Sequence, residues 1–367
     1  MLSSSRGMIY KKEKEKNVMK RKKIAIIFGG CSSEYEVSLQ SAYAVITHID
    51  QEKYEMVLIG IDQTGVWYLY QGEHADIPSD NWNKEESCIP VVVSPDRTLH
   101  GILLLKETGI ERLSLDCALP ILHGKNGEDG TVQGMLELAG IPLIGCNAMS
   151  SAICMDKEMA HRLARGCGVH VPTSYSLTEQ ERKNETKIIK YGEKLGYPLF
   201  VKPLRAGSSF GITKVTKPGE LLSAVEHAFA YDSQIILEEM VEGFEVGCAV
   251  LGTSELTVGE VDEIELSEGF FDYTEKYTLK SSKIHVPARI STEQAEEIKA
   301  AAERIYRGLG CSYFARVDLF VTPEGKIYFN EVNTIPGFTS HSRYPNMMKA
   351  IGISFEELLS RLLELQP

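Results

Sequence analysis

Two patterns of apolar residues follow one another near the start of the chain. Residues 22–30, KKIAIIFGG, contain a short apolar run that ends in two glycines, which is typical of a buried strand. Over residues 31–49 the apolar positions recur at helical spacing instead. A second unit of this kind, DCALPILHG at 116–124, leads through a Gly-rich turn into a predicted helix at 132–140. Two strand–turn–helix units predict a doubly wound α/β domain at residues 21–146.

The last third of the chain has the pattern of a β-hairpin. Two predicted strands, ARVDLFV and KIYFNEVN, are joined by the turn TPEG at 322–325. If the two ends of this turn pair with each other, Asp318 lies opposite Phe329 and Arg316 lies opposite Glu331. The hairpin therefore predicts that charged side chains from both strands share one face.

Oxygen-bearing side chains gather on this hairpin. Glu331 and Asn333 are two residues apart and point to the same side of their strand, so with Asp318 they would bring two carboxylates and an amide beside Arg316. Oxygen ligands without His or Cys favour Mg²⁺, which bridges substrate phosphates. A salt bridge between Arg316 and Glu331 is the simpler alternative, but it accounts neither for Asn333 nor for the Gly- and hydroxyl-rich loop that follows. The hairpin thus predicts a metal site next to a nucleotide.

Composition narrows the function classes. The chain has 367 residues, of which 43% are hydrophobic and 25% charged, as in ordinary globular proteins. Its formal net charge of −12 argues against a nucleic-acid partner. The eight cysteines form no CxxC pair, which favours reduced thiols in a cytoplasmic protein, and no apolar run is long enough to span a membrane. Residues 1–20 are charged and lack a signal-peptide core, so we expect a disordered leader.

A nucleotide site is expected in the middle of the chain. The stretch 197–215, YPLFVKPLRAGSSFGITKV, predicts a strand that delivers Lys202, a loop with Ser208 and Ser209, and a second strand. Such a loop can close over phosphates while the lysine neutralises them, although an ordinary Gly-Ser turn is the alternative. The acids that could serve an adenine amino group and ribose hydroxyls are Glu238, Glu239 and Glu245.

Two further candidate side chains stand at strand ends. Glu34 follows the first Gly turn, where it either holds a ligand or simply complements the dipole of the following helix. His123 lies where the second strand meets its Gly-rich turn, at the edge where open α/β sheets bind ligands. A histidine in this position is more often structural than catalytic, so these segments alone leave both residues open.

Six motifs, in order, resemble those of one enzyme family. They are LHGKNGEDGTVQG, MDK at 155–157, VKPLRAGSSFGI, EKY at 275–277, RVD and NEVNTIPGFTSHS. Together they resemble the D-alanine:D-alanine ligases, which are ATP-grasp enzymes. The resemblance implies an α/β (α+β) fold of three domains, at 21–146, 147–240 and 241–367, with ATP between the last two. It also implies that ATP phosphorylates the carboxylate of a first D-alanine and that the amine of a second substrate attacks the acyl phosphate.

The resemblance also implies roles for individual residues. The catalytic residues would be Glu34, Ser208, Tyr277, Arg316 and Gly337, with Arg316 and the Gly337 N–H stabilising an oxyanion. The substrate-binding residues would be Glu34, His123, Lys276, Ser342 and Arg343. ATP would be bound by Lys157, Lys202, Ser208, Ser209, Glu238, Glu239, Val241, Glu245 and Lys276. Asp318, Glu331 and Asn333 would hold Mg²⁺, with two ions expected and Mn²⁺ as an alternative.

The second substrate depends on two segments. GFFDYTEKYTLKSSK, at 269–283, is expected to fold over the site and exclude water, and its EKY tyrosine resembles ligases that use an amino acid rather than D-lactate. After the serine of SHS this chain has Arg343, where D-alanine:D-alanine ligases commonly have Leu, and a guanidinium can donate hydrogen bonds to a hydroxyl. This resembles the D-alanine:D-serine ligases of the VanG vancomycin-resistance type. The alternative is that Arg343 turns to solvent or caps a helix.

Three functional hypotheses follow. The first is a D-alanine:D-serine ligase that makes modified peptidoglycan precursors and confers vancomycin resistance, and the second is a housekeeping D-alanine:D-alanine ligase. The third is a non-catalytic nucleotide or amino-acid sensor, against which the full set of reactive groups argues. The resemblance further implies a cytoplasmic homodimer that acts on small molecules and binds neither nucleic acid nor a membrane.

Overall fold

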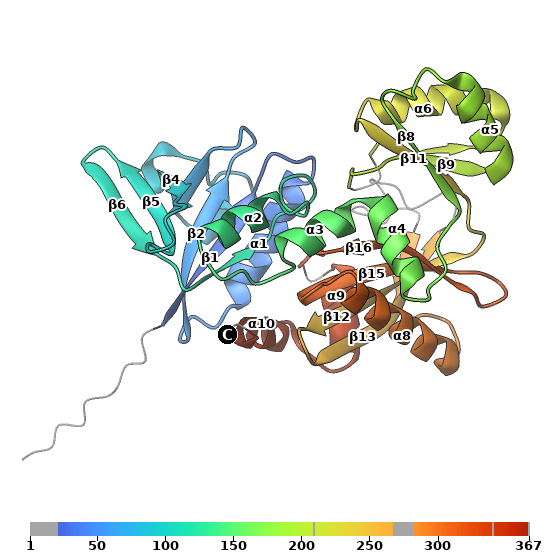
Figure 1. Ribbon diagram of the computed structural model, residues 1–367. Helices are drawn as coiled ribbons and strands as arrows, with labels where there is room; N and C mark the ends of the chain where they lie inside the picture. The colour runs from blue at the N-terminus through green and yellow to red at the C-terminus, as the bar shows by residue number, and fades with distance from the viewer. Residues whose placement is uncertain (1–20, 208–209, 267–281, 340, 366–367) are drawn as a thin grey trace, which may run out of the picture.

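Three β-sheets form the framework of the molecule (Figure 1). The computed structural model describes residues 21–207, 210–266, 282–339 and 341–365. The first sheet lies at the left of Figure 1, the second forms the lobe at the upper right, and the third lies below and between them. Within the described ranges, no helix is both long and apolar enough to cross a bilayer. The mixture of sheets and covering helices confirms the predicted α/β fold class.

The first sheet has the order β6-β5-β4-β3-β2-β1-β7. Its strands are β1 (Lys22–Gly29), β2 (Tyr54–Ile61), β3 (Trp67–Tyr70), β4 (Cys88–Val93), β5 (Gly101–Lys106), β6 (Gly109–Ser114) and β7 (Cys117–Pro120), with the short 3-10 helices η1 (His74–Asp76) and η2 (Glu85–Ser87) between β3 and β4. Strand β1 runs parallel to β2 and β7. Helices α1 (Tyr35–His48) and α2 (Thr131–Leu138) cover opposite faces, because Ile26 and Phe28 pack in one core with α1 while Ile27 packs in another with α2. This is the predicted doubly wound arrangement.

The second sheet is small and antiparallel, with the order β10-β9-β11-β8. Its strands are β8 (Ser174–Thr178), β9 (Leu199–Pro203), β10 (Thr213–Val215) and β11 (Gln234–Glu239). Helices α5 (Glu185–Leu195) and α6 (Leu221–Phe229), the latter preceded by η3 (Pro218–Glu220), share a core with Val201 and Leu237. Because strand side chains alternate, Lys202 and Glu238 lie on the opposite face, away from these helices.

The third sheet is antiparallel with the order β14-β13-β12-β15-β16. Its strands are β12 (Phe244–Gly252), β13 (Leu256–Leu266), β14 (Ser282–His285), β15 (Tyr313–Val321) and β16 (Ile327–Asn333). One face shares a core with α3 (Ala148–Met155), α4 (Lys157–Gly166) and α8 (Thr292–Gly308), and α9 (Arg343–Ala350) packs on β12 and β13. Helices α3 and α4 thus pack with the third sheet although they precede the second in the chain, and the domain limits at 147 and 241 stay a prediction.

The last helix joins the first and third sheets. Helix α10 (Phe355–Glu364) packs against α1, and one core cluster contains Phe28 of β1 together with Phe338, Tyr344 of α9 and Leu359 of α10. The loop between β16 and α9 is therefore buried against the first sheet.

The hairpin of β15 and β16 forms as predicted, but the predicted register was wrong. Gly325, with φ of +81°, makes the turn one residue longer on the β16 side, and a β-bulge follows at Asn330. Asp318 therefore lies opposite Glu331 instead of Phe329, and Arg316 lies opposite Asn333. The two one-residue shifts add up to two, so the acids and the amide stay on the same face as Arg316.

Candidate active site

A cavity of about 1090 Å³ is lined by residues from the first sheet's loops and from the third sheet. Seven residues predicted to act in catalysis, substrate binding or metal binding line it: Glu34, His123, Arg316, Asn333, Gly337, Ser342 and Arg343. They come from loops after β1 and β7, from β15 and β16, and from the chain that leads into α9. The fold thus gathers residues that are more than three hundred positions apart in the sequence.

Glu34 is buried at the start of α1 and is closely approached by two glycines. A Cβ at Gly124 would lie 2.4 Å from Glu34 Oε2, and one at Gly207 would lie 2.9 Å from it. A side chain at either position would displace the carboxylate, and Gly124 also has a φ of +70°, which favours glycine there. Gly207 belongs to the Gly-Ser loop after β9, so the carboxylate lies where that loop meets the first sheet.

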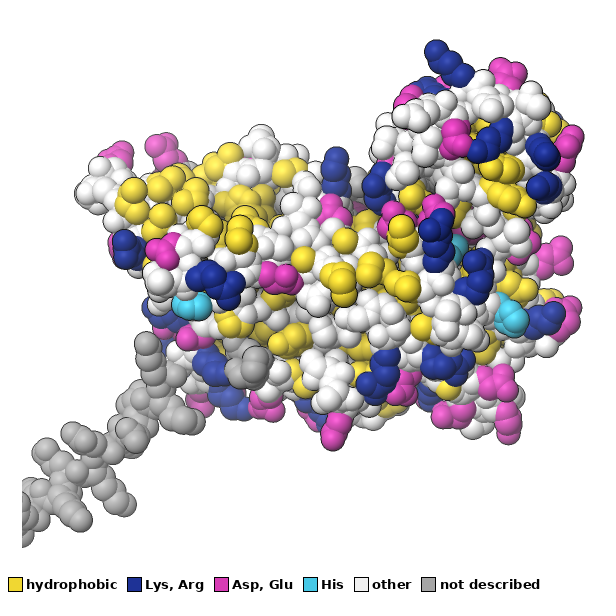
Figure 2. All heavy atoms as spheres, viewed as in Figure 1, with side chains coloured by type: hydrophobic (Ala, Val, Ile, Leu, Met, Phe, Trp, Pro, Cys, Tyr) yellow, Lys and Arg dark blue, Asp and Glu magenta, His cyan; other side chains and the backbone are white. Residues whose placement is uncertain are grey.

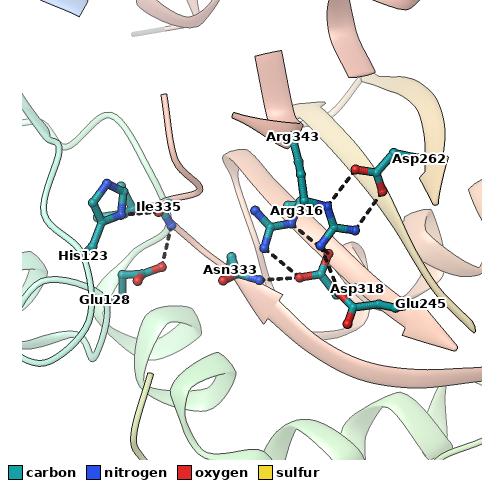
Figure 3. Close-up of polar contacts among 9 residues, drawn as sticks. All are labelled: His123, Glu128, Glu245, Asp262, Arg316, Asp318, Asn333, Ile335 and Arg343. Atoms are coloured by element: carbon teal, nitrogen blue, oxygen red, sulfur yellow. Dashed lines mark hydrogen bonds and ion pairs between the residues drawn. The ribbon is translucent and has the colours of Figure 1, made fainter. Parts of the chain in front are cut away.

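Asp318 is the centre of the polar cluster on the third sheet (Figure 3). Arg316 donates to both of its oxygens, with Nε–Oδ1 and Nη2–Oδ2 distances of 2.8 Å, and Asn333 Nδ2 donates to Oδ2 at 2.8 Å. Burial alone lowers the pKa of Arg316, but the neighbouring Asp318 carboxylate more than offsets this, and the pKa is raised. Arg316 is therefore a fixed positive charge at the cavity wall.

Arg343 is held by three carboxylates. Its Nε and Nη2 lie 2.7 Å from the two oxygens of Asp262, and its Nη1 lies 2.9 Å from Glu245 Oε1 and 3.4 Å from Asp318 Oδ1. Its side chain is 7% exposed, so Arg343 does not turn to solvent. A Cβ at Gly247 would lie 2.4 Å from Nη2, so only glycine leaves room for the guanidinium there.

Two acids of the site were not singled out from the sequence. Asp262 of β13 is fully buried and pairs with Arg343, but it is one of four acids in its strand and nothing in the sequence indicates that partner. Glu128 lies inside the motif LHGKNGEDGTVQG and lines the cavity. Burial and the neighbouring Glu34 raise the pKa of Glu128 from 4.5 to about 8. Glu128 could have been identified from the sequence, because it is an acid in the Gly-rich turn that follows the candidate His123.

His123 is buried and bonded on both ring nitrogens. Nδ1 lies 2.9 Å from the Ile335 carbonyl oxygen (Figure 3) and Nε2 lies 3.2 Å from Ser41 Oγ. Burial lowers the pKa of His123. Neither nitrogen is directed into the cavity without a partner.

A second group of predicted residues lies on the face of the second sheet that α5 and α6 do not cover. Lys202 and Glu238 form a buried ion pair, and His161 of α4 reaches it, with Nδ1 3.9 Å from Glu238 Oε2. Burial alone raises the pKa of Glu238, but Lys202, His161 and Lys157 together more than offset this, and the pKa is lowered. Lys157 Nζ donates to the Ala206 carbonyl at 3.0 Å, at the start of the Gly-Ser loop.

The remaining predicted ATP-binding residues do not form a single group in the structure. Glu239 Oε1 accepts from the Thr173 N–H at 2.7 Å, and Val241 is half-buried between β11 and β12. Glu245 contacts Arg343 and thus lies nearer the polar cluster than the Lys202 pair. Ser208, Ser209, Lys276 and Tyr277 lie outside the described residues.

The predicted metal ligands are close neighbours in the hairpin. Asp318 and Glu331 are directly opposite in register, and Asn333 contacts Asp318, so the set offers the oxygen types that Mg²⁺ prefers. Across the described chain, no three His, Cys, Asp or Glu side chains gather as a metal-binding group. Arg316 and Asn333 already donate to Asp318, so a metal would share this carboxylate with them.

Known proteins resemble the chain over most of its length. The family models described as the N-terminus and the C-terminus of D-ala D-ala ligase match residues 23–146 and 163–364. The crystal structure of VanG D-Ala:D-Ser ligase from Enterococcus faecalis is 56% identical, with a TM-score of 0.88, and the match covers 94% of this chain and 99% of that one.

Curated relatives have more than one function. The vancomycin/teicoplanin A-type resistance protein VanA of Enterococcus faecium is 46% identical over 95% of this chain and 99% of its own length. A D-alanine--D-alanine ligase of Caldicellulosiruptor bescii is 44% identical over 95% of both chains. Relatives of both kinds match the chain over nearly its whole length. The chain therefore belongs to the D-alanine:D-alanine ligase family of ATP-grasp enzymes.

Proposed function

We propose that this enzyme joins D-alanine to D-serine, using ATP and passing through a D-alanyl phosphate. The observation that carries this proposal is Arg343, a buried guanidinium in the cavity wall that Asp262 holds through two hydrogen bonds. The resemblance to a structure described as a D-Ala:D-Ser ligase supports it. The product would enter peptidoglycan precursors and weaken vancomycin binding, and the use of ATP favours the cytoplasm as the place of reaction.

Glu34 would bind the ammonium group of the first D-alanine. It is buried and lines the cavity, and the Gly124 and Gly207 backbones pack against it without side chains. A carboxylate in such a position would hold the amine at short range through charge-assisted hydrogen bonds. Ser208 and Tyr277 would complete this set.

Arg316 and the Gly337 N–H would stabilise the oxyanion of the tetrahedral intermediate. Both line the cavity, and Asp318 fixes the Arg316 guanidinium in two places. A donor that is already positioned costs no reorganisation during the reaction and is worth about 3 to 4 kcal/mol.

ATP would lie between the second and third sheets. Lys157 and Lys202 would neutralise its phosphates, together with Ser208, Ser209 and Lys276, while Glu238, Glu239, Val241 and Glu245 would bind the nucleoside. Asp318, Glu331 and Asn333 would hold Mg²⁺ there, which supplies charge neutralisation as the phosphoryl group moves.

The second amino acid would lie near Ser342 and Arg343, at the N-terminus of α9. The helix N-terminus and Ser342 would bind its carboxylate. Three of the five N–H groups of Arg343 make hydrogen bonds to Asp262 and Glu245, and Asp318 is a further ion-pair partner at 3.4 Å. The second hydrogen of Nη2 would donate to the serine hydroxyl. In this pocket D-serine gains a hydrogen bond that D-alanine cannot make.

A D-alanine:D-alanine ligase is the second candidate. The relative from Caldicellulosiruptor bescii with that function favours it, since it matches over the same share of the chain. In this case the acids that surround Arg343 would keep it from the substrate.

The test is Mg²⁺-dependent release of ADP with D-alanine alone, and then with D-serine or D-lactate added, with each product identified by mass. A predominant D-alanyl-D-serine product supports the proposal. Predominant D-alanyl-D-alanine would establish the second candidate, whereas no ADP with any substrate would leave only binding as a function.

Two copies of the chain would form a homodimer through the first sheet. Strand β6 ends this sheet, and Val92, Leu105 and Ile110 are exposed on β4, β5 and β6. Figure 2 shows hydrophobic side chains gathered over this part of the molecule. An exposed apolar patch beside a sheet edge favours self-association.

A further inference from the structure

The loop between β16 and α9 contains Gly337 and is held from the first sheet's side of the cavity. Ile335 lies two residues before Gly337, and its carbonyl oxygen lies 2.9 Å from His123 Nδ1. The Ile335 N–H donates to Glu128 Oε1 at 3.0 Å, and the Phe338 N–H donates to Ser41 Oγ at 3.3 Å. Backbone groups on both sides of Gly337 are thus bound by three side chains that belong to α1 and to the turn after β7.

The chemistry of the partners fixes the direction of each hydrogen bond. A carbonyl oxygen only accepts, so His123 Nδ1 must carry a hydrogen and donate it to Ile335. Ser41 Oγ accepts from Phe338, so its own hydrogen is available for His123 Nε2, 3.2 Å away. Burial lowers the pKa of His123 and so favours the neutral ring, and we infer the Nδ1–H tautomer, in which Nε2 carries no hydrogen and accepts from Ser41. The imidazole has no remaining position for a substrate proton.

Glu128 ties the turn after β7 to the same loop. Its Oε2 accepts from the Gly124 N–H at 2.9 Å, while Oε1 accepts from Ile335. Each oxygen therefore binds a backbone donor, one from each side of the cavity (Figure 3 draws the Ile335 contact). The side chains of Ile335 and Phe338 are buried in the core shared with β1, which keeps the loop in place between these bonds.

We propose that His123, Glu128 and Ser41 are positioning residues that hold the loop from Ile335 to Phe338, so that the Gly337 N–H points at the developing oxyanion. This rests on the proposed function of Gly337 as an oxyanion donor. The donor must lie within hydrogen-bond distance of an atom that moves during the reaction, and a misplacement of 1 Å reduces the rate on the order of a hundredfold. The same turn carries Gly124, which packs on Glu34, so the lobe that binds the first D-alanine also sets the oxyanion donor.

A pair of substitutions at His123 tests which ring nitrogen matters. In His123→Asn the amide nitrogen takes the place of Nδ1 and still donates to Ile335, whereas in His123→Gln it takes the place of Nε2 and does not. We expect kcat for dipeptide formation to fall about tenfold or less in His123→Asn and on the order of a hundredfold in His123→Gln. KM for D-alanine should change little in either. If His123 is instead a proton acceptor, both variants lose activity equally and one limb of the pH–rate profile disappears.

The corresponding test at Glu128 has a matched control. In Glu128→Gln one oxygen is replaced by a donor that faces a backbone N–H, so one of the two bonds is lost. Glu137 of α2 also accepts a backbone N–H, from Ala148 at 2.9 Å, and lies away from the cavity. We expect Glu128→Gln to release more ADP per dipeptide formed, since the tetrahedral step loses its donor, while Glu137→Gln keeps the wild-type ratio. An unchanged ratio in Glu128→Gln at an unchanged melting temperature would overturn the proposal.

One measurement separates this proposal from the proposed function. The ¹⁵N chemical shifts of the His123 ring in the wild-type protein without substrates report its tautomer and need no activity. The Nδ1–H form is expected, and an Nε2–H or doubly protonated ring would overturn the positioning role. If the wild type makes no dipeptide but His123 shows the Nδ1–H form, the proposed function fails while the hydrogen-bonded loop stands.

Discussion

The role of Arg343 becomes clear only when its contacts are known. From the sequence it is a polar replacement in an apolar pocket. In the structure it neutralises Asp262, which is fully buried, and also contacts Glu245 and Asp318. Removing one partner of a buried ion pair costs roughly 3 to 5 kcal/mol, because the other charge is left uncompensated. A test of Arg343 must therefore change Asp262 as well.

The double variant Arg343→Leu/Asp262→Asn removes both charges of this pair. We expect the preference for D-serine over D-alanine to fall on the order of tenfold to a hundredfold, since a contact with one small group is worth about 1 to 3 kcal/mol. The measurement is the ratio of the two dipeptides formed in competition. The melting temperature of the double variant is the control for folding, and an unchanged ratio in the double variant would remove Arg343 from the explanation of specificity.

Glu128 predicts a pH dependence of stability. Burial and Glu34 raise its pKa from 4.5 to about 8, so the folded protein binds this proton more tightly than the unfolded chain. The contribution is fully present below pH 4.5 and is lost as the pH rises through 8. We expect the melting temperature of Glu128→Gln to depend less on pH over this interval than that of the wild type. Glu137→Gln should follow the wild-type curve, and identical slopes for all three would contradict the shift.

At the scale of elements, the hairpin of β15 and β16 positions the proposed metal ligands. Its register depends on Gly325, whose φ of +81° falls in the left-handed region, and on the bulge at Asn330. One shift alone would turn Glu331 and Asn333 to the core side, and the second returns them to the side of Asp318. The turn at Gly325 and the bulge at Asn330 are thus both needed to place Glu331 and Asn333 on the same face as Asp318.

Gly325→Ala probes the first of these irregularities. The left-handed conformation costs an L-residue about 1 to 2 kcal/mol, and the new Cβ would also lie 2.9 Å from Gln294 Oε1. We expect the free energy of unfolding, measured in urea, to fall by about that amount. Gly219→Ala is the matched control, because no atom lies within 4 Å of its Cβ position. Equal losses in both variants would show that the turn does not require glycine.

At the scale of the whole molecule, the lobes are joined by shared structure around the cavity. Helix α10 packs on α1, and the loop before α9 is bound by His123, Glu128 and Ser41. The second sheet instead has a core of its own. The first and third sheets thus form one wall around the proposed amino-acid pocket, and the second sheet supplies Lys202 and Glu238 from a separately packed unit.

The proposed homodimer is tested at the edge of the first sheet. Ile110 of β6 is 69% exposed, and a charge there would oppose burial against a second copy. We expect Ile110→Glu to shift the protein toward monomer in sedimentation velocity without loss of fold. Ile189→Glu, at an exposed position on α5 of the second sheet's unit, should leave the association unchanged. A wild-type protein that is monomeric at all concentrations would rule out the dimer.

The sequence by itself determined the local elements and the residue types of the site. The two strand–turn–helix units, the hairpin and the Gly-Ser loop follow from short-range periodicity and turn chemistry, and the order of motifs identified the family. The same local rules placed Glu331 and Asn333 on one face of the strand. This prediction holds despite the wrong register, because a shift of two residues leaves every side chain on the same face.

Only the tertiary structure decided which side chains meet. Asp262 and Arg343 are far apart in the chain, and they become partners only because β13 and α9 pack together. The sequence left the partners of His123 open, and the structure places its Nδ1 against the buried Ile335 carbonyl. Glu128 lies within a recognised motif, but the partner that gives it a role is 207 residues away. Such contacts depend on how sheets and helices pack, and local sequence patterns do not show which residues distant in the chain will meet.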